Sequence, residues 1–236
     1  MNIDKKVVKD LEKCINPQKR EIFPRFFKTG KGEYGEGDIF WGITVPNIRN
    51  ISKRYYKEIS LEEIKELIQS PIHEIRLTGY LILTYKYEKA SIKEKGNIIS
   101  FYLNNLKGVN NWDIVDLSCY KILGMGIVEG ILEKEILYTL VKSKNMWERR
   151  ISIVSTYVLI KRGMYEDTLK ISKILLEDTS DLIQKAVGWM LREVGKKDID
   201  VLREFLDENI AIMSRTTLRY SIERMDEKER KKYLNL

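Results

Sequence analysis

The sequence has very few of the residues on which many enzymes rely. It holds one histidine, His73, and two cysteines, Cys14 and Cys119, which lie far apart along the 236 residues. A structural zinc site needs several closely spaced Cys or His ligands, so none is expected. Any catalytic pair that includes a histidine must use His73. Two cysteines without a spacing pattern favour a reducing compartment.

Long apolar runs and proline are scarce as well. No apolar stretch approaches the roughly 18 residues that a membrane span needs. The first residues, MNIDKKVVKDLEK, are charged and amphipathic, unlike a signal peptide. We therefore expect a cytoplasmic protein with no membrane contact. With only 4 prolines and no long strand-like alternation, the sequence predicts an all-α fold, which we interpret as one domain over 1–236.

Helical spacing of apolar residues runs through most of the chain. Ser60 and Glu63 form a capping-box pattern before one apolar helix face. Similar patterns predict helices over 47–56, 92–106, 131–141 and 169–176. The irregular stretch Gly30–Gly42 holds five glycines. Because no strand precedes it and no Gly-Lys-Ser/Thr follows, a flexible loop is favoured over a phosphate cradle.

Five segments share a helical-hairpin rhythm at intervals of 30 to 40 residues. This repetition favours a HEAT-like α-solenoid, a superhelix with a concave groove, over a generic helical protein. Aligning the apolar positions places five residues in one slot: Arg76, Asp116, Arg150, Lys185 and Arg215. Three positions later the residues are small or apolar, as expected against a neighbouring helix: Gly79, Cys119, Ile153, Gly188 and Leu218.

Four of the five slot residues are cations, and the formal net charge is +7. A row of cations at repeat spacing suits a phosphate backbone, although a solvated helix face is the usual role of an isolated arginine. Asp116 interrupts the row. At this point it is either a functional carboxylate or the partner of Arg150 in a structural ion pair.

Three of the four tryptophans lie close in sequence to slot residues. Trp112 precedes Asp116 by four positions, Trp147 precedes Arg150 by three, and Trp189 follows Lys185 by four. A single tryptophan is more often a core residue than a ligand contact. Several around one carboxylate favour a site that recognises something flat or cationic.

The motifs NNWDIVD (110–116), NMWERR (145–150), QKAVGWMLRE (184–193) and GDIFWGITVP (37–46) resemble the AlkD-type DNA alkylation repair glycosylases, in order and at similar spacing. The resemblance implies a HEAT-like solenoid that holds duplex DNA and excises cationic N3- and N7-alkylated purines. Trp112 and Trp189 match the family's aromatic pair against the lesion deoxyribose, and Asp116 matches the catalytic carboxylate. Arg150 matches the cation that contacts the DNA backbone. The family's second-helix tyrosine is replaced here by Arg25-Phe26-Phe27.

The predicted site therefore has catalytic Asp116, Trp112 and Trp189, and DNA-binding Arg150, Arg76, Lys185, Arg192 and Arg215. The predicted reaction is hydrolysis of the N-glycosidic bond, with Asp116 stabilising an oxocarbenium-like state and orienting water. We expect no cofactor and no metal, alkylated double-stranded DNA as the partner, and a monomer. The alternative is a non-catalytic HEAT-like scaffold that binds protein or nucleic acid, RNA included.

Overall fold

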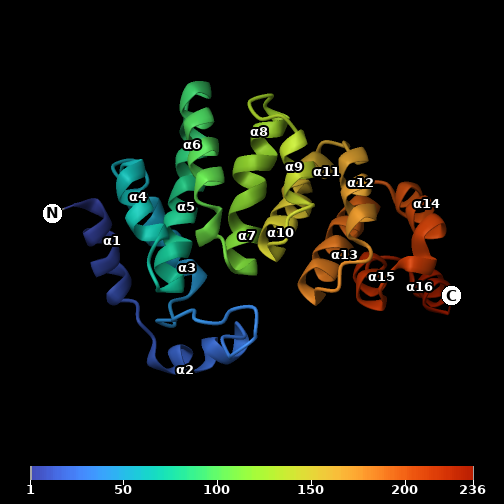
Figure 1. Cartoon of the computed structure of the whole chain (residues 1–236), viewed down its shortest axis with the longest axis horizontal. Helices are drawn as coiled ribbons and strands as arrows, with labels where there is room; N and C mark the ends of the chain where they lie inside the picture. The colour runs from blue at the N-terminus through green and yellow to red at the C-terminus, as the bar shows by residue number, and fades with distance from the viewer. Residues whose placement is uncertain (1, 236) are drawn as a thin grey trace. The chain divides into compact units, whose positions relative to one another are not determined.

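The computed structural model describes residues 2–235, which fold into helices, with one long connection between Phe26 and Val45 (Figure 1). These residues contain no β-strand, only an isolated bridge between Ile39 and Ile72. Across the same residues, no helix combines the length and apolar composition that a membrane crossing needs. The fold is thus all-α, as predicted. The chain divides into two compact units, one ending at Ser118 and the other starting at Cys119, while the single domain over 1–236 stays a prediction.

Unit 1 is built around helix α5, which is buried along most of its length. Helices α3 and α4 pack against it, and α1 packs against both of these. The segment after α2 lies at the end where α5 begins, since the backbone N–H of His73 donates to the carbonyl of Ile39 (2.9 Å). The helices of this unit are α1 (Ile3–Glu12), α2 (Pro17–Phe26), α3 (Val45–Tyr55), α4 (Leu61–Ile68), α5 (His73–Lys89), α6 (Ile92–Asn104), η1 (Leu106–Gly108) and α7 (Trp112–Cys119).

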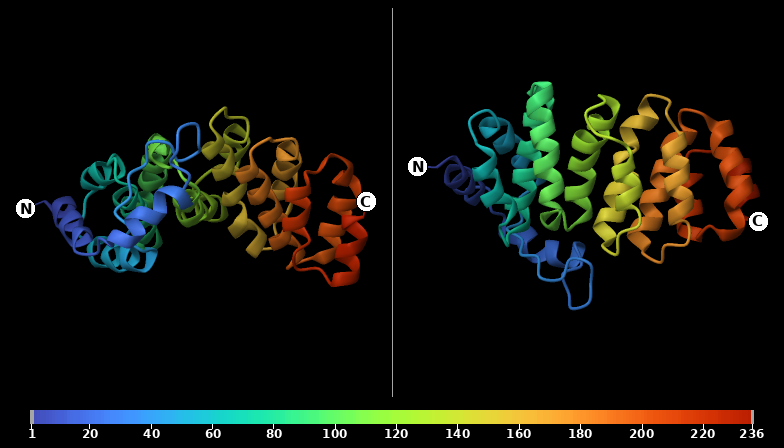
Figure 2. Two further views of the ribbon diagram at one scale, coloured as in Figure 1. Left: turned by 90° about the horizontal axis from the view of Figure 1, so that it is seen from below. Right: turned by 45° about the horizontal axis from the view of Figure 1, so that its top comes forward.

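Unit 2 is organised around helix α13, which packs against α10, α12, α14 and α15 (Figure 2). This succession of packed helices is the helical-repeat arrangement predicted from the sequence. The helices are η2 (Tyr120–Gly124, a π-helix), α8 (Met125–Val128), α9 (Glu135–Leu140), α10 (Met146–Ser155), α11 (Tyr157–Lys161), α12 (Glu166–Leu175), α13 (Asp181–Gly195), α14 (Ile199–Asn209), η3 (Ile210–Ile212), α15 (Arg215–Ser221) and α16 (Glu227–Leu234).

The local helix signals behave as expected, with one exception. The capping box of α4 is confirmed, with Glu63 N donating to Ser60 Oγ (3.2 Å) and Ser60 N donating to Glu63 Oε2 (2.9 Å). The helix predicted over 131–141 is wrong in its first turn, because α9 begins only at Glu135. Gly130 has a positive φ of 69°, and the next two backbone N–H groups turn back to the carbonyl of Gly126.

The small and apolar positions of the repeats are buried, as predicted: Gly79, Cys119, Ile153, Gly188 and Leu218. At Gly188 the fit is tight, because an added Cβ would lie 2.4 Å from Tyr220 Cβ and 2.7 Å from the Thr217 carbonyl oxygen. Gly188 therefore lies in close contact between α13 and α15. The repeat therefore requires glycine here.

Replacing Gly188 by alanine is expected to destabilise unit 2 by about 1–3 kcal/mol, because α13 and α15 must move apart. Gly96, within α6, is the matched control, since an added Cβ would meet nothing within 4 Å. Gly96→Ala should instead stabilise by about 0.5–1 kcal/mol through helix propensity. Urea unfolding of both variants tests this pair. Equal effects would contradict the packing argument.

Candidate active site

Helix α7 carries two of the predicted catalytic residues, Trp112 and Asp116, one turn apart. The helix begins here because Asn111 closes its first turn. Its side-chain oxygen accepts from Trp112 N (2.9 Å), and its carbonyl accepts from Val115 N (3.1 Å). Trp112 and Asp116 are both half-buried. The helical spacing predicted from the sequence is confirmed, and it places an indole and a carboxylate on the same helix face.

Trp112 is braced by an aromatic stack from the segment after helix α2. Its ring lies on Phe27, with centroids 5.4 Å apart and planes inclined by 15°. Phe27 stacks in turn on Phe40 (4.7 Å), and Phe40 on the imidazole of His73 (4.6 Å). Phe26 contacts the edge of Trp112 (6.0 Å) and is 58% exposed. Phe26 and Phe27 therefore both pack against the indole of Trp112.

Behind this stack lies a buried cluster of charged side chains. His73 is 1% exposed and lies between two carboxylates, with Nδ1 at 3.1 Å from Asp38 and Nε2 at 2.8 Å from Asp113. Arg76 donates to the other oxygen of Asp38 (2.5 Å) and to the side chain of Asn110 (3.0 Å). Asp38 comes from the glycine-rich segment and Asp113 from α7. The cluster thus ties both to α5.

The cluster favours a charged histidine. Burial lowers the pKa of His73, but the charge and hydrogen bond of Asp113, followed by those of Asp38, outweigh it and raise the pKa to about 9. Burial raises the pKa of Asp38, yet the hydrogen bond from His73 and the charge of Arg76 hold it below its ordinary value. At neutral pH the imidazolium is therefore a buried cation between two carboxylates.

A second buried carboxylate fixes the end of the glycine-rich segment. Glu74 is 1% exposed and accepts three backbone hydrogen bonds of 2.7–3.1 Å, from Trp41, Gly42 and Ile43. Gly42 has a φ of 78°, and an added Cβ would lie 2.4 Å from a backbone oxygen. The stretch Gly30–Gly42, predicted as a flexible loop, is thus anchored to α5 at its end.

In unit 2, Trp189 lies on α13 and is half-buried, with its ring 5.9 Å from that of Tyr157 at an inclination of 41°. Arg192, one turn later, pairs with Glu223. Trp189 and Arg192 both belong to the QKAVGWMLRE motif of α13, whereas Tyr157 is the first residue of α11. Unit 2 therefore offers its own indole and guanidinium on one helix.

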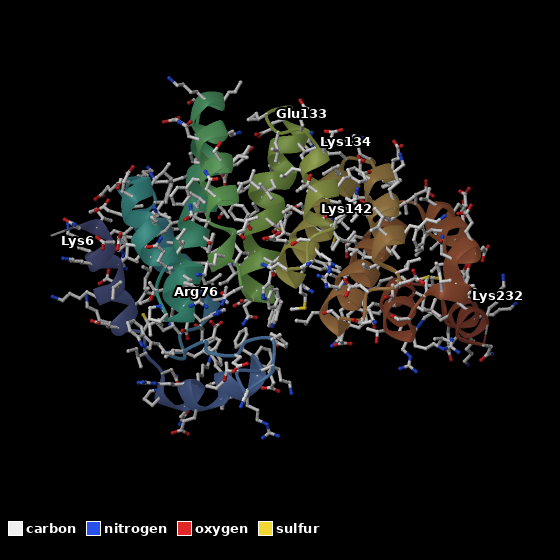
Figure 3. All side chains as sticks on the ribbon, in the orientation of Figure 1. Lys6, Arg76, Glu133, Lys134, Lys142 and Lys232 are labelled. Atoms are coloured by element: carbon white, nitrogen blue, oxygen red, sulfur yellow. The ribbon has the colours of Figure 1, made fainter. Side chains whose placement is uncertain are left out.

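The remaining predicted cations differ in exposure. Arg150 is only 5% exposed and donates to the carbonyl of Leu182. Lys185 pairs with Asp181 one turn earlier (2.7 Å), and Arg215 is exposed at the start of α15. Arg76, labelled in Figure 3, is likewise 5% exposed and held by Asp38. The predicted cations are thus not a uniform exposed row, because protein partners hold two of them inside.

The helix beginnings correct the predicted repeat register. Asp116, Arg150 and Lys185 are each the fifth residue of their helix, which confirms their equivalence. Arg76 is the fourth residue of α5 and Arg215 the first of α15, so their placement in the same slot is wrong. The fourth residue instead shares one bond, to the carbonyl six positions earlier: Arg76 to Ser70 (2.9 Å), Arg149 to Ser143 (3.0 Å) and Gln184 to Asp178 (3.0 Å).

Comparison with known proteins identifies the family. Residues 7–225 match the family model described as DNA alkylation repair enzyme. The chain belongs to this family. A predicted DNA alkylation repair enzyme from Enterococcus faecalis has a similar structure, with a TM-score of 0.70 at 20% identity over 90% of this chain and 97% of that one. AlkD2 from Streptococcus mutans matches with a TM-score of 0.57 at 16% identity, over 89% and 98% of the two chains. No curated protein matches the sequence.

Sequence reasoning on this DNA alkylation repair protein missed Asp38 and Asp113, which hold His73. Asp113 lies inside the NNWDIVD motif, but the motif gives no sign that this carboxylate points to a histidine 40 residues earlier. Asp38 is the last carboxylate of the glycine-rich stretch, between Gly37 and the apolar IFW triplet. A charged residue next to an apolar triplet was the only available signal.

Proposed function

We propose that this chain is a DNA glycosylase that hydrolyses the N-glycosidic bond of cationic N3- and N7-alkylpurines in duplex DNA. The observation that carries the proposal is helix α7, on which Asp116 and a braced Trp112 share one face. Membership of the DNA alkylation repair family supports a repair substrate. The role of Trp189 as the second aromatic contact, and a monomeric enzyme, belong to the same proposal.

The chemistry needs little beyond a carboxylate and aromatic faces. An alkylated purine is already cationic, so it leaves as a neutral base and requires no general acid. As it leaves, positive charge develops on the deoxyribose. The Asp116 carboxylate stabilises that charge and orients the attacking water. The face of Trp112 presents negative quadrupole density to the same sugar, which contributes about 0.5–2 kcal/mol.

The aromatic stack explains how Trp112 serves this role without reorganisation. An indole stacked on Phe27 and contacted at its edge by Phe26 keeps its orientation when DNA arrives. Preorganised groups stabilise a transition state at no cost of rearrangement during the reaction. Among the predicted cations, Lys185, Arg192 and Arg215 are proposed to contact backbone phosphates directly. Arg150 joins them by exchanging the Leu182 carbonyl for a phosphate oxygen.

The test measures release of bases from three duplex DNAs. The protein is expected to release 3-methyladenine and 7-methylguanine from methylated duplex, and to leave uracil and 8-oxoguanine in place. Uracil and 8-oxoguanine are poor leaving groups unless they are protonated. The proposed mechanism supplies no proton to them. Chromatography of the released bases gives the answer. Efficient release of uracil or 8-oxoguanine contradicts the mechanism, and intact DNA binding without any release favours the scaffold.

A further inference from the structure

Unit 1 contains a cavity of about 620 Å³ at the end of α5 that also carries the charged cluster. The cavity lies among the end of α4, the start of α5, the end of α6 and η1. The residues that define its chemistry are Lys65, Gln69, Arg76, Asn104, Lys107 and Asn110. No carboxylate is among the described residues that line it. It is thus a cavity of positive charge and amide groups, the opposite of an apolar ligand pocket.

Two of its cations are available to a ligand. Lys65 and Lys107 are exposed, and within the described residues neither side chain has an ion pair or hydrogen bond. The two lysines come from α4 and η1, and both line the cavity. An anion bound in the cavity would be attracted by both charges.

The buried part of the cavity lining includes the guanidinium of Arg76. Arg76 is 5% exposed, its two terminal nitrogens are bonded within the protein, and its Nε is buried without a hydrogen-bond partner. The floor beside it is tightly packed, since a Cβ on Gly108 would lie 2.6 Å from the hydroxyl of Tyr80. That hydroxyl donates to the carbonyl of Asn105 (2.6 Å). The cavity is therefore preformed by packing.

We infer that this cavity binds a phosphate of a DNA strand together with the nucleoside attached to it. The two lysines suit a phosphate, and the amides of Gln69 and Asn104 offer both donors and acceptors to a sugar or base edge. A volume of about 620 Å³ exceeds what a bare phosphate needs. Asn110 lines the cavity two residues before Trp112, which places this contact beside α7. The inference rests on the proposed function for the identity of the strand as DNA.

The test is the salt dependence of binding to unmodified duplex DNA. Log K falls as log salt rises, and each lost phosphate contact makes this negative slope shallower by about 0.9. Because both lysines serve one phosphate, the double variant Lys65→Gln, Lys107→Gln should make the slope shallower by about 1. The control variant Lys9→Gln, Lys93→Gln removes the same charge from exposed lysines of α1 and α6 and should leave the slope unchanged. Thermal melting confirms that both variants fold.

A second experiment distinguishes binding of a DNA strand from binding of a free nucleotide. Calorimetric titration with dAMP and with inorganic phosphate is expected to show no saturable binding at concentrations where duplex DNA binds. Equal slopes for the double variant and its control overturn the inference. Saturable dAMP binding that the double variant loses, with an unchanged DNA slope, also overturns it, because the ligand is then a free nucleotide. Neither readout uses base release, so failure of the glycosylase proposal leaves both arms interpretable.

Discussion

His73→Gln is expected to destabilise the protein by about 3 kcal/mol below pH 6.5, because it leaves two buried carboxylates without the cation between them. Glutamine keeps a hydrogen-bond donor and removes the charge, so the variant isolates the electrostatic part of the contact. The carboxylate of Asp38 retains Arg76 as a partner. We therefore expect a folded, weakened variant rather than an unfolded chain.

The pH dependence gives the sharper form of this prediction. The pKa of His73 is raised from 6.5 to about 9 in the folded protein. The stability it adds is fully present below pH 6.5 and is lost as the pH rises through 9, with a total of about 3 kcal/mol. The difference between wild type and His73→Gln should therefore shrink over that window. Urea unfolding from pH 6 to 10 measures it.

The comparison is clean because His73 is the sole histidine of the sequence. Every other group that titrates between pH 6 and 10 is present in both proteins, so its contribution cancels in the difference. Two unfolding free energies that run parallel across this range would show that folding does not shift the pKa of His73. The ion-pair description of the cluster would then be wrong.

Local patterns in the sequence predicted much of the fold. Helix periodicity, the Ser60–Glu63 capping box and the four-residue spacing of Trp112 and Asp116 each depend on neighbours within one turn, and the structure has all three. The repeat alignment was right for the middle repeats because their helices begin at the same distance before the slot. It failed for Arg76 and Arg215, where apolar spacing alone did not locate the first residue of the helix.

The charged cluster illustrates what the sequence did not reveal. His73 lies 35 residues from Asp38 and 40 from Asp113, and no periodic pattern connects the three. Buried charges are rare, so sequence reasoning places such residues on the surface by default. The alignment of apolar positions assigned Arg76 to a DNA-facing row. The structure shows instead that the guanidinium of Arg76 is buried and forms an ion pair with Asp38.

Asp116→Asn is expected to slow release of methylated purines by about 100- to 1,000-fold, the size of effect seen when one preorganised electrostatic contact to a transition state is removed. Asparagine has nearly the same shape, so DNA binding should change by only a few-fold. Glu62→Gln, the same carboxylate-to-amide change at an exposed position of α4, should keep the wild-type rate. Single-turnover release from methylated duplex measures both variants.

The size of this loss distinguishes the roles open to Asp116. If the carboxylate stabilises the developing sugar cation, the amide lowers the rate of the chemical step and leaves the affinity for DNA nearly intact, because the unreacted sugar carries no charge. If it serves only as a structural ion-pair partner, the amide lowers stability and affinity while the single-turnover rate at saturating protein is preserved. A wild-type rate in Asp116→Asn would therefore remove Asp116 from catalysis. Trp112 on the same helix face would then have to act without a carboxylate, and the aromatic contribution of about 0.5–2 kcal/mol falls short of a glycosylase rate enhancement.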